Sequence, residues 1–283
     1  MSVILKLKMM RENFSKMEQK IADYILNHPE EVKQLTTYQV AKICKTSQAS
    51  IVRFAKKMGF SGYPDFKLSL SQDIGVRSAK KEVSIIDSEI NSDDSLQEVC
   101  QKVAHENVKA IEDTYSLLDF KELERAVKAL AKAKKIMILG AGFSGVVAKD
   151  LSYKLLELGK DVVFEMDFHI QLSLLSTMGV KDILFVISYS GKTKEIYEIT
   201  KKAKERGILI ITLTTIAGNP IRDLGDITLN TVELNKNFRA TALSPRISQM
   251  TIIDMLYVQL ILENKEMEEN ILEAMEIVKN FKL

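Results

Sequence analysis

Apolar residues recur at helical spacing through the first 77 residues. Ser15 and Glu18 have the spacing of a capping box, in which each side chain bonds the backbone of the other residue, and Thr36 and Gln39 repeat it. These signals and the apolar positions predict helices over residues 15–27, 36–44, 48–58 and 65–74. The two middle helices are short and are joined by a short break, which predicts a helix-turn-helix within an all-α domain.

The third of these helices has two distinct faces. Its apolar stripe consists of Ile51, Phe54, Ala55 and Met58. The other face and the preceding turn carry residue types that bind DNA, because Gln and Arg can form paired hydrogen bonds with base edges, while Ser, Thr and Lys bind phosphates. The candidate DNA-binding residues are Thr46, Ser47, Gln48, Ser50, Arg53, Lys56 and Lys57. A solvated face on a small helical bundle is the alternative explanation.

The helical period is lost after Arg77, and the charged, Ser- and Asp-rich stretch that follows is typical of an interdomain linker. A further capping box at Ser95 then predicts a long helix that ends near Leu117. Its apolar positions predict packing on the next domain or on a partner subunit. These positions are Val99, Val103, Val108 and Ile111.

Short apolar runs alternate with helical patterns in the rest of the chain. The runs predict strands over residues 135–139, 161–164, 182–187, 208–214 and 227–230, and a strongly apolar helix over residues 247–264. This alternation predicts an α/β domain with a parallel sheet and helices on both faces. The predicted division is a helix-turn-helix domain (1–77), a linker with the long helix (78–124), an α/β domain (125–265) and a C-terminal helix (266–283).

Hydroxyl-bearing residues follow the third predicted strand, at the point where a helix begins. Ser188, Ser190 and Thr193 can each donate a hydrogen bond, Gly191 allows close approach of the backbone, and the helix end adds unpaired N–H groups. The combination is typical of a phosphate-binding loop, and Tyr189 lies inside it. An ordinary strand-to-helix connection with capping side chains is the alternative.

A second glycine-containing turn follows the first predicted strand. Residues 140–145 have the pattern Gly-x-Gly-x-x-Gly, and Glu165 stands twenty positions further on. This pattern matches the dinucleotide-binding fingerprint, so an NAD(P)-dependent enzyme is a competing hypothesis. The second, hydroxyl-rich loop and the DNA-binding character of the N-terminal domain count against it. The two turns open at the same edge of a parallel sheet and can therefore converge on one ligand.

Charge is divided unevenly between the two halves of the chain. Residues 1–77 carry 13 Lys and Arg against 7 Asp and Glu, a net charge of +6, and residues 78–283 carry 27 against 31, a net charge of −4. This asymmetry favours nucleic acid as the partner of the first domain only. Cys44 and Cys100 are far apart and lack metal-site spacing, which predicts buried reduced thiols. The absence of a long apolar run indicates a cytoplasmic protein without a membrane segment.

Three parts of the chain resemble the RpiR family of bacterial transcriptional regulators: SKMEQKIADYILNHPEEV, VAKICKTSQASIVRFAKKMGFSGYPDFK and the hydroxyl-rich residues 188–193, here called the serine loop. The resemblance extends over nearly the whole chain. In that family, a helix-turn-helix domain precedes a sugar-isomerase (SIS) domain that senses a phosphosugar. The resemblance implies that residues 37–56 form the DNA-reading motif and that the two turns of the α/β domain bind the effector.

The resemblance also assigns roles within the effector site. It implies that Ser188, Ser190 and Thr193 hold the phosphate, and that Ser144 and the backbone of Gly142 contact the sugar or its phosphate. It places the segment 233–248, which contains Glu233 and Arg239, near the ligand and the subunit interface. The candidate effector-binding residues are Gly142, Ser144, Ser188, Tyr189, Ser190, Gly191, Thr193 and Glu233.

Catalytic residues are not evident in the α/β domain. Sugar isomerisation needs a positioned acid or base, and only His169 could approach the site, with no carboxylate partner visible in the sequence. We therefore expect a non-catalytic regulator of carbohydrate metabolism, in which a phosphorylated sugar or amino sugar modulates binding to operator DNA. We expect a homodimer or homotetramer without a cofactor or metal. A phosphosugar isomerase is the alternative function.

Overall fold

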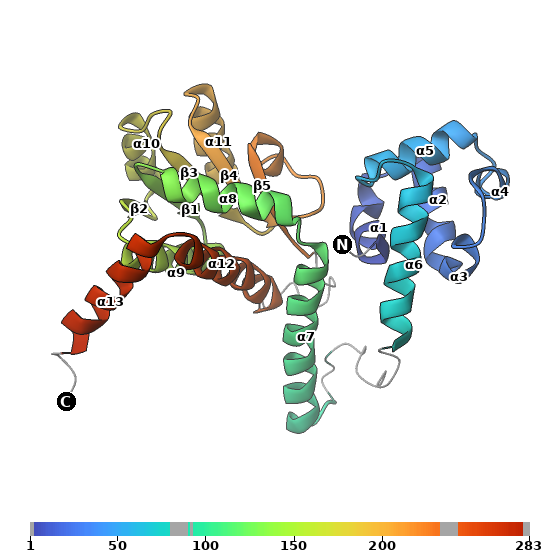
Figure 1. The fold of residues 1–283 in the computed structure, drawn as a ribbon, viewed down its shortest axis with the longest axis horizontal. Helices are drawn as coiled ribbons and strands as arrows, with labels where there is room; N and C mark the ends of the chain where they lie inside the picture. Colours follow the sequence, from blue (N-terminus) through green and yellow to red (C-terminus); the bar gives the residue numbers. More distant parts are fainter. Residues whose placement is uncertain (1–2, 80–89, 91–92, 233–242, 280–283) are drawn as a thin grey trace. The chain divides into compact units, whose positions relative to one another are not determined.

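The computed structural model describes residues 3–79, 90, 93–232 and 243–279. The chain forms two compact units, which meet in sequence between Glu106 and Asn107. Each unit has its own hydrophobic core. The ribbon in Figure 1 identifies the helices and strands of both units.

The N-terminal unit is helical. Both predicted capping boxes are present, because the Ser15 hydroxyl accepts the backbone N–H of Glu18 and the Thr36 hydroxyl accepts that of Gln39. The last helix begins two residues earlier than predicted, since Pro64 is tolerated in a first turn. The elements are α1 (Val3–Met10), the 3₁₀-helix η1 (Arg11–Asn13), α2 (Lys16–Asn27), α3 (Pro29–Val32), α4 (Thr37–Ile43), α5 (Gln48–Lys57) and α6 (Tyr63–Ala79).

The sequence pattern does not predict α1, yet this helix belongs to the core of the unit. Val3 and Leu7 are completely buried. Met58 is the C-cap residue of α5, and its carbonyl oxygen accepts a hydrogen bond from Lys6 Nζ at 2.8 Å. The carboxylate of Asp73 on α6 accepts the backbone N–H of Ile4, so α1 connects the end of α5 to α6.

Aromatic rings fill the centre of the N-terminal unit. The ring of Phe54 on α5 meets the ring of Phe14 edge-on, with centroids 5.2 Å apart, and also contacts Phe66 of α6. All three side chains are at most 4% exposed. The predicted inward stripe of α5 is confirmed, because all its members are buried: Ile51, Phe54, Ala55 and Met58.

One long helix, α7 (Leu96–Leu117), crosses the sequence boundary between the units and begins at the predicted capping box. Val108 and Ile111 are 55% and 41% exposed within the chain, so they do not pack on the C-terminal unit, and packing on a partner subunit stays a prediction. A different face of α7 is buried, formed by Ala110, Thr114 and Leu117. Cys100 on α7 is also exposed, so only Cys44 is the buried thiol that the sequence predicts.

The C-terminal unit contains a parallel sheet and helices. Its strands are β1 (Ile136–Gly140), β2 (Val162–Phe164), β3 (Ile183–Ser188), β4 (Leu209–Thr215) and β5 (Ile227–Thr231), each within one residue of its predicted limits. Its further elements are α8 (Phe120–Lys132), α9 (Phe143–Glu157), α10 (Phe168–Ser176), α11 (Lys194–Glu205), the 3₁₀-helix η2 (Arg222–Leu224), α12 (Leu243–Glu263) and α13 (Lys265–Lys279). The sequence pattern does not predict α8 and α10.

The strand order of the sheet is β2-β1-β3-β4-β5, with all pairs parallel. Strand β1 pairs directly with β3, and the register runs from Ile136 opposite Ile183 to Gly140 opposite Ile187. Helices α8, α9 and α12 contribute to the core on one face, and α10 and α11 to the core on the other. The predicted fold class is therefore confirmed, and the turns after β1 and β3 are neighbours at one edge.

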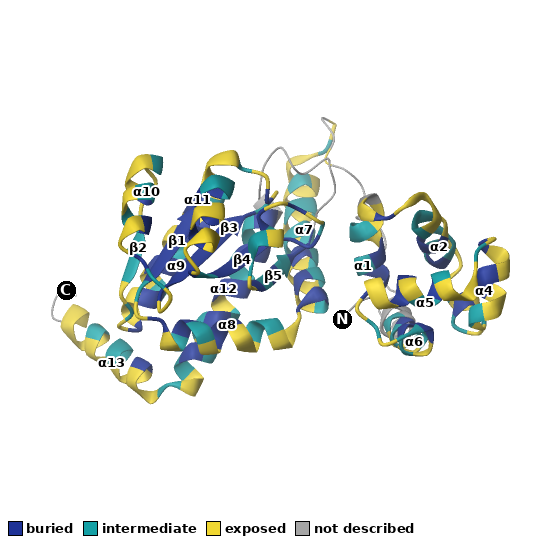
Figure 2. Ribbon diagram, turned by 90° about the horizontal axis from the view of Figure 1, so that it is seen from above, coloured by how far each residue is buried: buried dark blue, intermediate teal, exposed yellow. Residues whose placement is uncertain are grey.

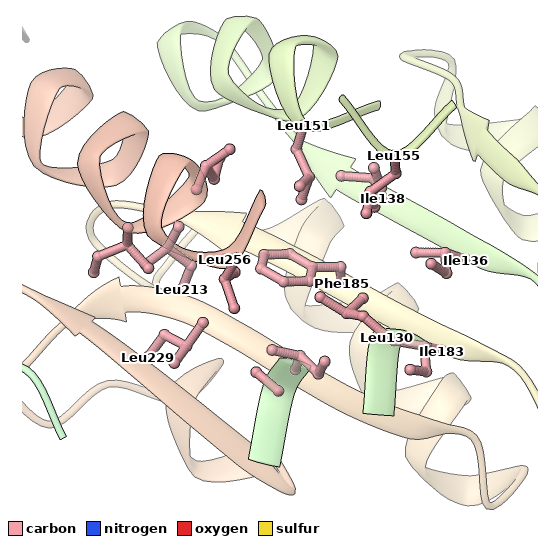
Figure 3. Packing of buried hydrophobic residues seen from close by; sticks show 14 of the residues in the cluster. Leu130, Ile136, Ile138, Leu151, Leu155, Ile183, Phe185, Leu213, Leu229 and Leu256 are labelled. Carbon is pink, nitrogen blue, oxygen red and sulfur yellow. The ribbon is translucent and has the colours of Figure 1, made fainter. Parts of the chain in front are cut away.

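Strand side chains form the centre of this unit. Figure 2 shows β1, β3 and β4 almost entirely in the colour of buried residues. Figure 3 shows Phe185 of β3 among the labelled side chains of the sheet, α8, α9 and α12. Phe185 is completely buried, as are Leu130 of α8 and Leu256 of α12. Continuous apolar burial on both faces explains why the strands of a parallel sheet appear as unbroken hydrophobic runs.

The strongly apolar helix α12 is part of the protein core. Its residues Ile252, Ile253, Leu256 and Leu260 are at most 1% exposed. None of the described helices combines the length and hydrophobicity needed to cross a bilayer. The following helix, α13, extends away from the sheet in Figure 1, and Met267 is its buried residue.

Candidate anion site and DNA-binding face

A cavity of about 190 Å³ lies between the turns that follow β1 and β3. It is lined by Ala141, Phe143, Ser144, Ile187, Ser188, Tyr189, Ser190 and Thr193. Both turns therefore contribute hydroxyl groups to one cavity. Gly142 and Gly191 belong to the same two turns but do not line this cavity, and Glu233 and Arg239 lie outside the described residues.

The hydroxyl groups of the serine loop differ in their surroundings. Ser188 ends β3 and is 4% exposed, whereas Ser190 is exposed. The Ser190 Oγ accepts the backbone N–H of Lys192 at 3.3 Å, which leaves its own proton for another acceptor. Thr193 occupies the N-cap position of α11, and its side chain makes no capping hydrogen bond. The loop thus offers hydroxyl donors toward the cavity.

Gly191 gives the loop its shape. Its φ of +62° is in the left-handed region, and a Cβ atom at this position would lie only 1.7 Å from Asn219 Oδ1. Asn219 is 3% exposed, and its Nδ2 donates to Thr214 Oγ1, to the carbonyl of Thr215 and to that of Ala217. Its Oδ1 accepts the backbone N–H of the residue that starts η2. Asn219 is therefore a fixed support on which the serine loop rests.

Two helix N-termini open at this edge of the sheet. Helix α9 begins after Gly142 and α11 after Thr193, and neither N-cap residue makes a side-chain capping bond. The first N–H groups of a helix have no intrahelical partner, and the helix dipole adds partial positive charge there. Hydroxyl donors beside two such ends make a site suited to an anion such as a phosphate.

The glycine pattern after β1 has a structural explanation that involves no dinucleotide. A Cβ on Gly140 would lie 2.6 Å from the carbonyl oxygen of Ser144, and one on Gly145 would lie 3.2 Å from that of Gly140. These glycines permit tight packing of the strand, the turn and α9. The carboxylate of Glu165 accepts the backbone N–H groups of Met166 and the next residue, so it closes its own turn.

A second, larger cavity of about 650 Å³ adjoins the other side of this turn. Gly142 lines this one. It is formed mainly by one face of α9 and by residues at the end of β2. Its lining residues are Gly142, Gly145, Val146, Lys149, Asp150, Tyr153, Phe164, Glu165, Met166 and Met250.

His169 does not line either of these cavities. It is exposed in the first turn of α10, where the carboxylate of Asp167 accepts its backbone N–H. In the described part of the chain, no group of three or more His, Cys, Asp or Glu side chains could hold a metal ion.

Sequence reasoning misses two buried polar residues that contact the site. Asn219 supports the serine loop, and the Nε2 of Gln249 on α12 lies 3.5 Å from the Oγ of Ser144. Gln249 is 1% exposed. A Gln inside the strongly apolar run 247–264 and an Asn before a Pro were the available signals. Neither signal indicates its spatial partner.

Helix α5 presents polar side chains on the face opposite its buried stripe. Gln48, Arg53, Lys56 and Lys57 are exposed, as is Ser47 in the preceding turn. Thr46 and Ser50 are partly exposed. The Ser47 Oγ accepts the backbone N–H of Ser50, so it also caps the helix. The Arg53 guanidinium donates to Ser50 Oγ at 3.0 Å.

The turn between α4 and α5 adds features that the sequence prediction omits. Lys45 has a φ of +53°, and the backbone N–H of Thr46 donates to the carbonyl of Ala41. Tyr38 on α4 is 59% exposed, and Lys42 is also exposed. The motif therefore offers an aromatic and two further cationic side chains beside α5.

Lys57 differs from the other candidate DNA-binding residues because it has a partner within the protein. Its Nζ lies 2.8 Å from the carboxylate of Glu18 on α2 and 5.5 Å from the ring centroid of Phe14. Burial acts to raise the pKa of Glu18, but hydrogen bonds from Lys57 and Ser15 outweigh it, and the pKa is lowered. Lys57 thus fixes α5 to α2.

Comparison with protein families assigns both parts of the chain. Residues 1–76 match the helix-turn-helix domain of the rpiR family. Residues 129–259 match the SIS domain. The strand order β2-β1-β3-β4-β5 differs from the order 3-2-1-4-5-6 of the classic dinucleotide-binding fold. The preference for a SIS domain over a dinucleotide-binding domain is confirmed.

Solved structures resemble the chain in two ways. The NanR protein of Vibrio vulnificus, in complex with ManNAc-6P, is 28% identical over 99% of this chain and 98% of that chain, with a TM-score of 0.62. The sugar isomerase domain of an RpiR transcription factor from Sphaerobacter thermophilus is 20% identical and covers 64% of this chain and 99% of that chain, with a TM-score of 0.58.

The phosphoheptose isomerase GmhA of Neisseria gonorrhoeae is 19% identical and covers 59% of this chain and 99% of that chain, with a TM-score of 0.51. Its likeness shows the fold of the C-terminal unit. The whole-chain likeness, by contrast, is to a protein that extends over both units. With an N-terminal rpiR-type helix-turn-helix domain followed by a SIS domain, the chain belongs to the RpiR family of transcriptional regulators.

Proposed function

We propose that this regulator senses a phosphorylated sugar or amino sugar in its SIS domain and that the bound effector modulates binding of α4 and α5 to operator DNA. The observation that carries the proposal is the hydroxyl-lined cavity beside two uncapped helix N-termini. Such a site binds the phosphate group that all candidate effectors share. The protein would act in the cytoplasm as a regulator of carbohydrate metabolism.

The phosphate would be held by Ser188, Ser190 and Thr193 together with the first N–H groups of α11. Ser144 would contact the sugar or its phosphate, and the backbone of Gly142, which lines the adjoining cavity, would contact the sugar. A hydrogen bond to a charged group contributes about 1.5 to 3 kcal/mol. Loss of one hydroxyl donor would therefore weaken binding by roughly 10- to 150-fold.

The complex of NanR with ManNAc-6P supports a phosphorylated amino sugar as the effector class. Selectivity among sugars would come from the shape of the site around the phosphate rather than from the hydroxyls that bind it. We propose no catalytic role for the site, because His169, the candidate acid or base for sugar isomerisation, lines neither cavity.

DNA would be read by the exposed face of α5. Gln48 and Arg53 would form hydrogen bonds with base edges in the major groove, and Ser47, Ser50 and Lys56 would bind phosphates, with Thr46 in the preceding turn. Lys57, which is paired with Glu18, would contact phosphate only at the cost of that ion pair.

We also propose that the regulator works as a homodimer or homotetramer. The exposed face of α9 supports this, because Val146, Tyr153 and Leu156 are 52%, 57% and 51% exposed. An apolar stripe of this kind is typical of a surface that a partner covers. Two subunits would place two α5 helices on a near-palindromic operator. Light scattering of the purified protein measures the number of subunits.

Calorimetric titration with a panel of hexose and N-acetylhexosamine 6-phosphates, NAD and NADP tests the effector site. Ser190→Ala removes a hydroxyl donor, and Ser173→Ala removes an exposed hydroxyl on α10 that bonds its own helix. We expect a phosphosugar to bind the parent and Ser173→Ala equally and Ser190→Ala at least tenfold more weakly. Binding of a dinucleotide, with no phosphosugar bound, would refute the proposal.

The DNA-binding face is tested by selecting bound sequences from a random pool and measuring affinity by fluorescence anisotropy. Arg53→Ala is expected to lower affinity for the selected site by about 5- to 150-fold, as loss of one base contact of about 1 to 3 kcal/mol predicts. Lys20→Ala removes an exposed charge of the same sign from a different helix, α2, and serves as the control. Equal loss in both variants would show that α5 does not read bases.

A further inference from the structure

Helix α12 carries two adjacent buried polar residues that reach different neighbours. Ser248 is completely buried and Gln249 is 1% exposed. Gln249 Nε2 lies 3.5 Å from Ser144 Oγ. Ser144 lines the cavity of about 190 Å³ between the turns after β1 and β3, here called the anion cavity. Ser248 Oγ donates to the carbonyl oxygen of Ala110 on α7 at 3.4 Å. One turn of α12 therefore touches both the cavity wall and the helix that leads to the N-terminal unit.

The contact with Gln249 determines the role of the Ser144 hydroxyl. An amide nitrogen is a donor only, so Ser144 Oγ must act as the acceptor in this contact. The proton of the hydroxyl is then directed to a different acceptor, and the cavity is the space that Ser144 lines. An anion in the cavity is such an acceptor. Gln249 thus fixes Ser144 as a donor to an anionic ligand.

The contact between Ser248 and Ala110 joins α12 to α7, a helix that does not line the anion cavity. Ala110 is completely buried on α7, and α7 crosses the sequence boundary between the two compact units. Buried polar groups are costly to leave without a partner, so Ser248 and Gln249 tend to keep their contacts when α12 shifts. Ser248 and Gln249 are consecutive residues of one rigid helix. A movement of α12 that shortens the Gln249–Ser144 contact therefore also changes the Ser248–Ala110 contact.

We propose that Gln249 is a positioning residue of the effector site and that the Ser248–Gln249 pair transmits occupancy of the cavity to α7. The inference rests on the proposed function and adds its route of regulation. In the free protein, both contacts are long for hydrogen bonds. A ligand that accepts the Ser144 proton strengthens the Gln249 contact, because hydrogen bonds in a chain polarise one another, and it draws in the turn that holds Ser248.

The test is hydrogen exchange of the full-length chain with and without saturating N-acetylmannosamine 6-phosphate, followed over residues 107–117. In the parent, we expect the ligand to slow exchange in this segment at least fivefold. Ser248→Ala should bind the ligand within twofold of the parent and lose most of that protection. Thr251→Ala is the matched control, since its hydroxyl bonds only its own helix, at the carbonyl of Ile247.

Gln249 is tested by affinity. Gln249→Met, which keeps the length of the side chain without a donor, should weaken ligand binding about tenfold, the effect of one hydrogen bond of about 1.4 kcal/mol. Gln249→Glu keeps the shape but accepts the Ser144 proton, so it should weaken binding more than Gln249→Met. If Gln249 had a purely structural role, Gln249→Glu would weaken binding less than Gln249→Met, because the Glu side chain has the same shape as Gln and fills the same space.

The two proposals fail in different ways. Absence of phosphosugar binding to the parent would overturn the proposed function and this inference with it. Binding to the parent, with equal protection of residues 107–117 in Ser248→Ala and Thr251→Ala, would overturn the transmission alone. Unchanged affinity in Gln249→Met would overturn the positioning role. Circular dichroism establishes that each variant is folded before these comparisons.

Discussion

Replacement of Gly191 by alanine tests the support of the serine loop by Asn219. The substitution has two separable costs. A left-handed φ of +62° costs a side-chain-bearing residue about 1 to 2 kcal/mol. The new Cβ would also lie 1.7 Å from Asn219 Oδ1 and 2.0 Å from Asn219 Cγ, which no real contact allows.

Asn219 cannot move away from the new Cβ without losing hydrogen bonds of its side chain. It is 3% exposed and makes hydrogen bonds with Thr214, Thr215, Ala217 and the backbone N–H of Arg222. If two of these bonds are lost at about 1 kcal/mol each, the total cost of Gly191→Ala reaches about 3 to 4 kcal/mol. The serine loop would shift as well, so affinity for the effector should fall in parallel.

Two other glycines of the same unit separate these costs. Gly207 has a φ of +70°, but a Cβ there would meet only Val180 at an ordinary 3.8 Å, so Gly207→Ala carries the conformational cost alone. Gly179 has open space around it, and Gly179→Ala should change stability by less than about 1 kcal/mol. Urea unfolding followed by circular dichroism measures all three free energies. Equal destabilisation by Gly191→Ala and Gly207→Ala would refute the argument, because the close approach to Asn219 would then cost nothing.

Further variants test the ion pair and the two cores. Glu18→Gln should destabilise the N-terminal unit by about 0.5 to 1 kcal/mol at neutral pH, measured by hydrogen exchange of α2. The folded pKa of Glu18 lies below its ordinary 4.5, so its stabilisation is present above that value and lost as the pH falls through the folded pKa; a gap between parent and variant that persists in acid would contradict this. Phe185→Ala, at a completely buried position, should cost about 3 to 5 kcal/mol, whereas Phe120→Ala, at a side chain that is 58% exposed, should cost less than about 1 kcal/mol in the same urea assay. Leu7→Ala should cost about 2 to 5 kcal/mol because α1 is part of the core, and Leu68→Ala, 61% exposed, is its control.

Local signals explain which parts of the fold are predictable from the sequence. Capping boxes at Ser15 and Thr36 act over three residues, so their spacing alone locates the helix starts. The strands appear as apolar runs because both faces of the sheet are buried. Helix α1 has neither signal, since no Glu or Gln stands three residues after Ser2 to complete a capping box. The helix is instead stabilised by contacts with α5 and α6, which come later in the sequence.

The candidate site also contains residues that local sequence signals predict and residues that they do not. The hydroxyl residues of the serine loop are consecutive in sequence and follow a strand, so their chemistry and position can be inferred together. Gln249 contacts Ser144 across 105 residues, and Asn219 meets Gly191 from the turn after a different strand. Such contacts depend on how α12 and β4 pack, which no short pattern encodes. The exposure of Val108 is a similar case, because tertiary packing buries the face of α7 that carries Ala110 and Thr114.

The pairing of β1 with β3 has a consequence for folding kinetics. The two walls of the anion cavity come from the turns that follow these strands, and α9, β2 and α10 lie between the two strands in the sequence. A partly folded chain without this non-local pairing has no cavity, and non-local parallel pairing forms slowly. Effector would therefore recognise only the completed sheet. Rising effector concentration should slow unfolding of the SIS domain while leaving its folding rate unchanged.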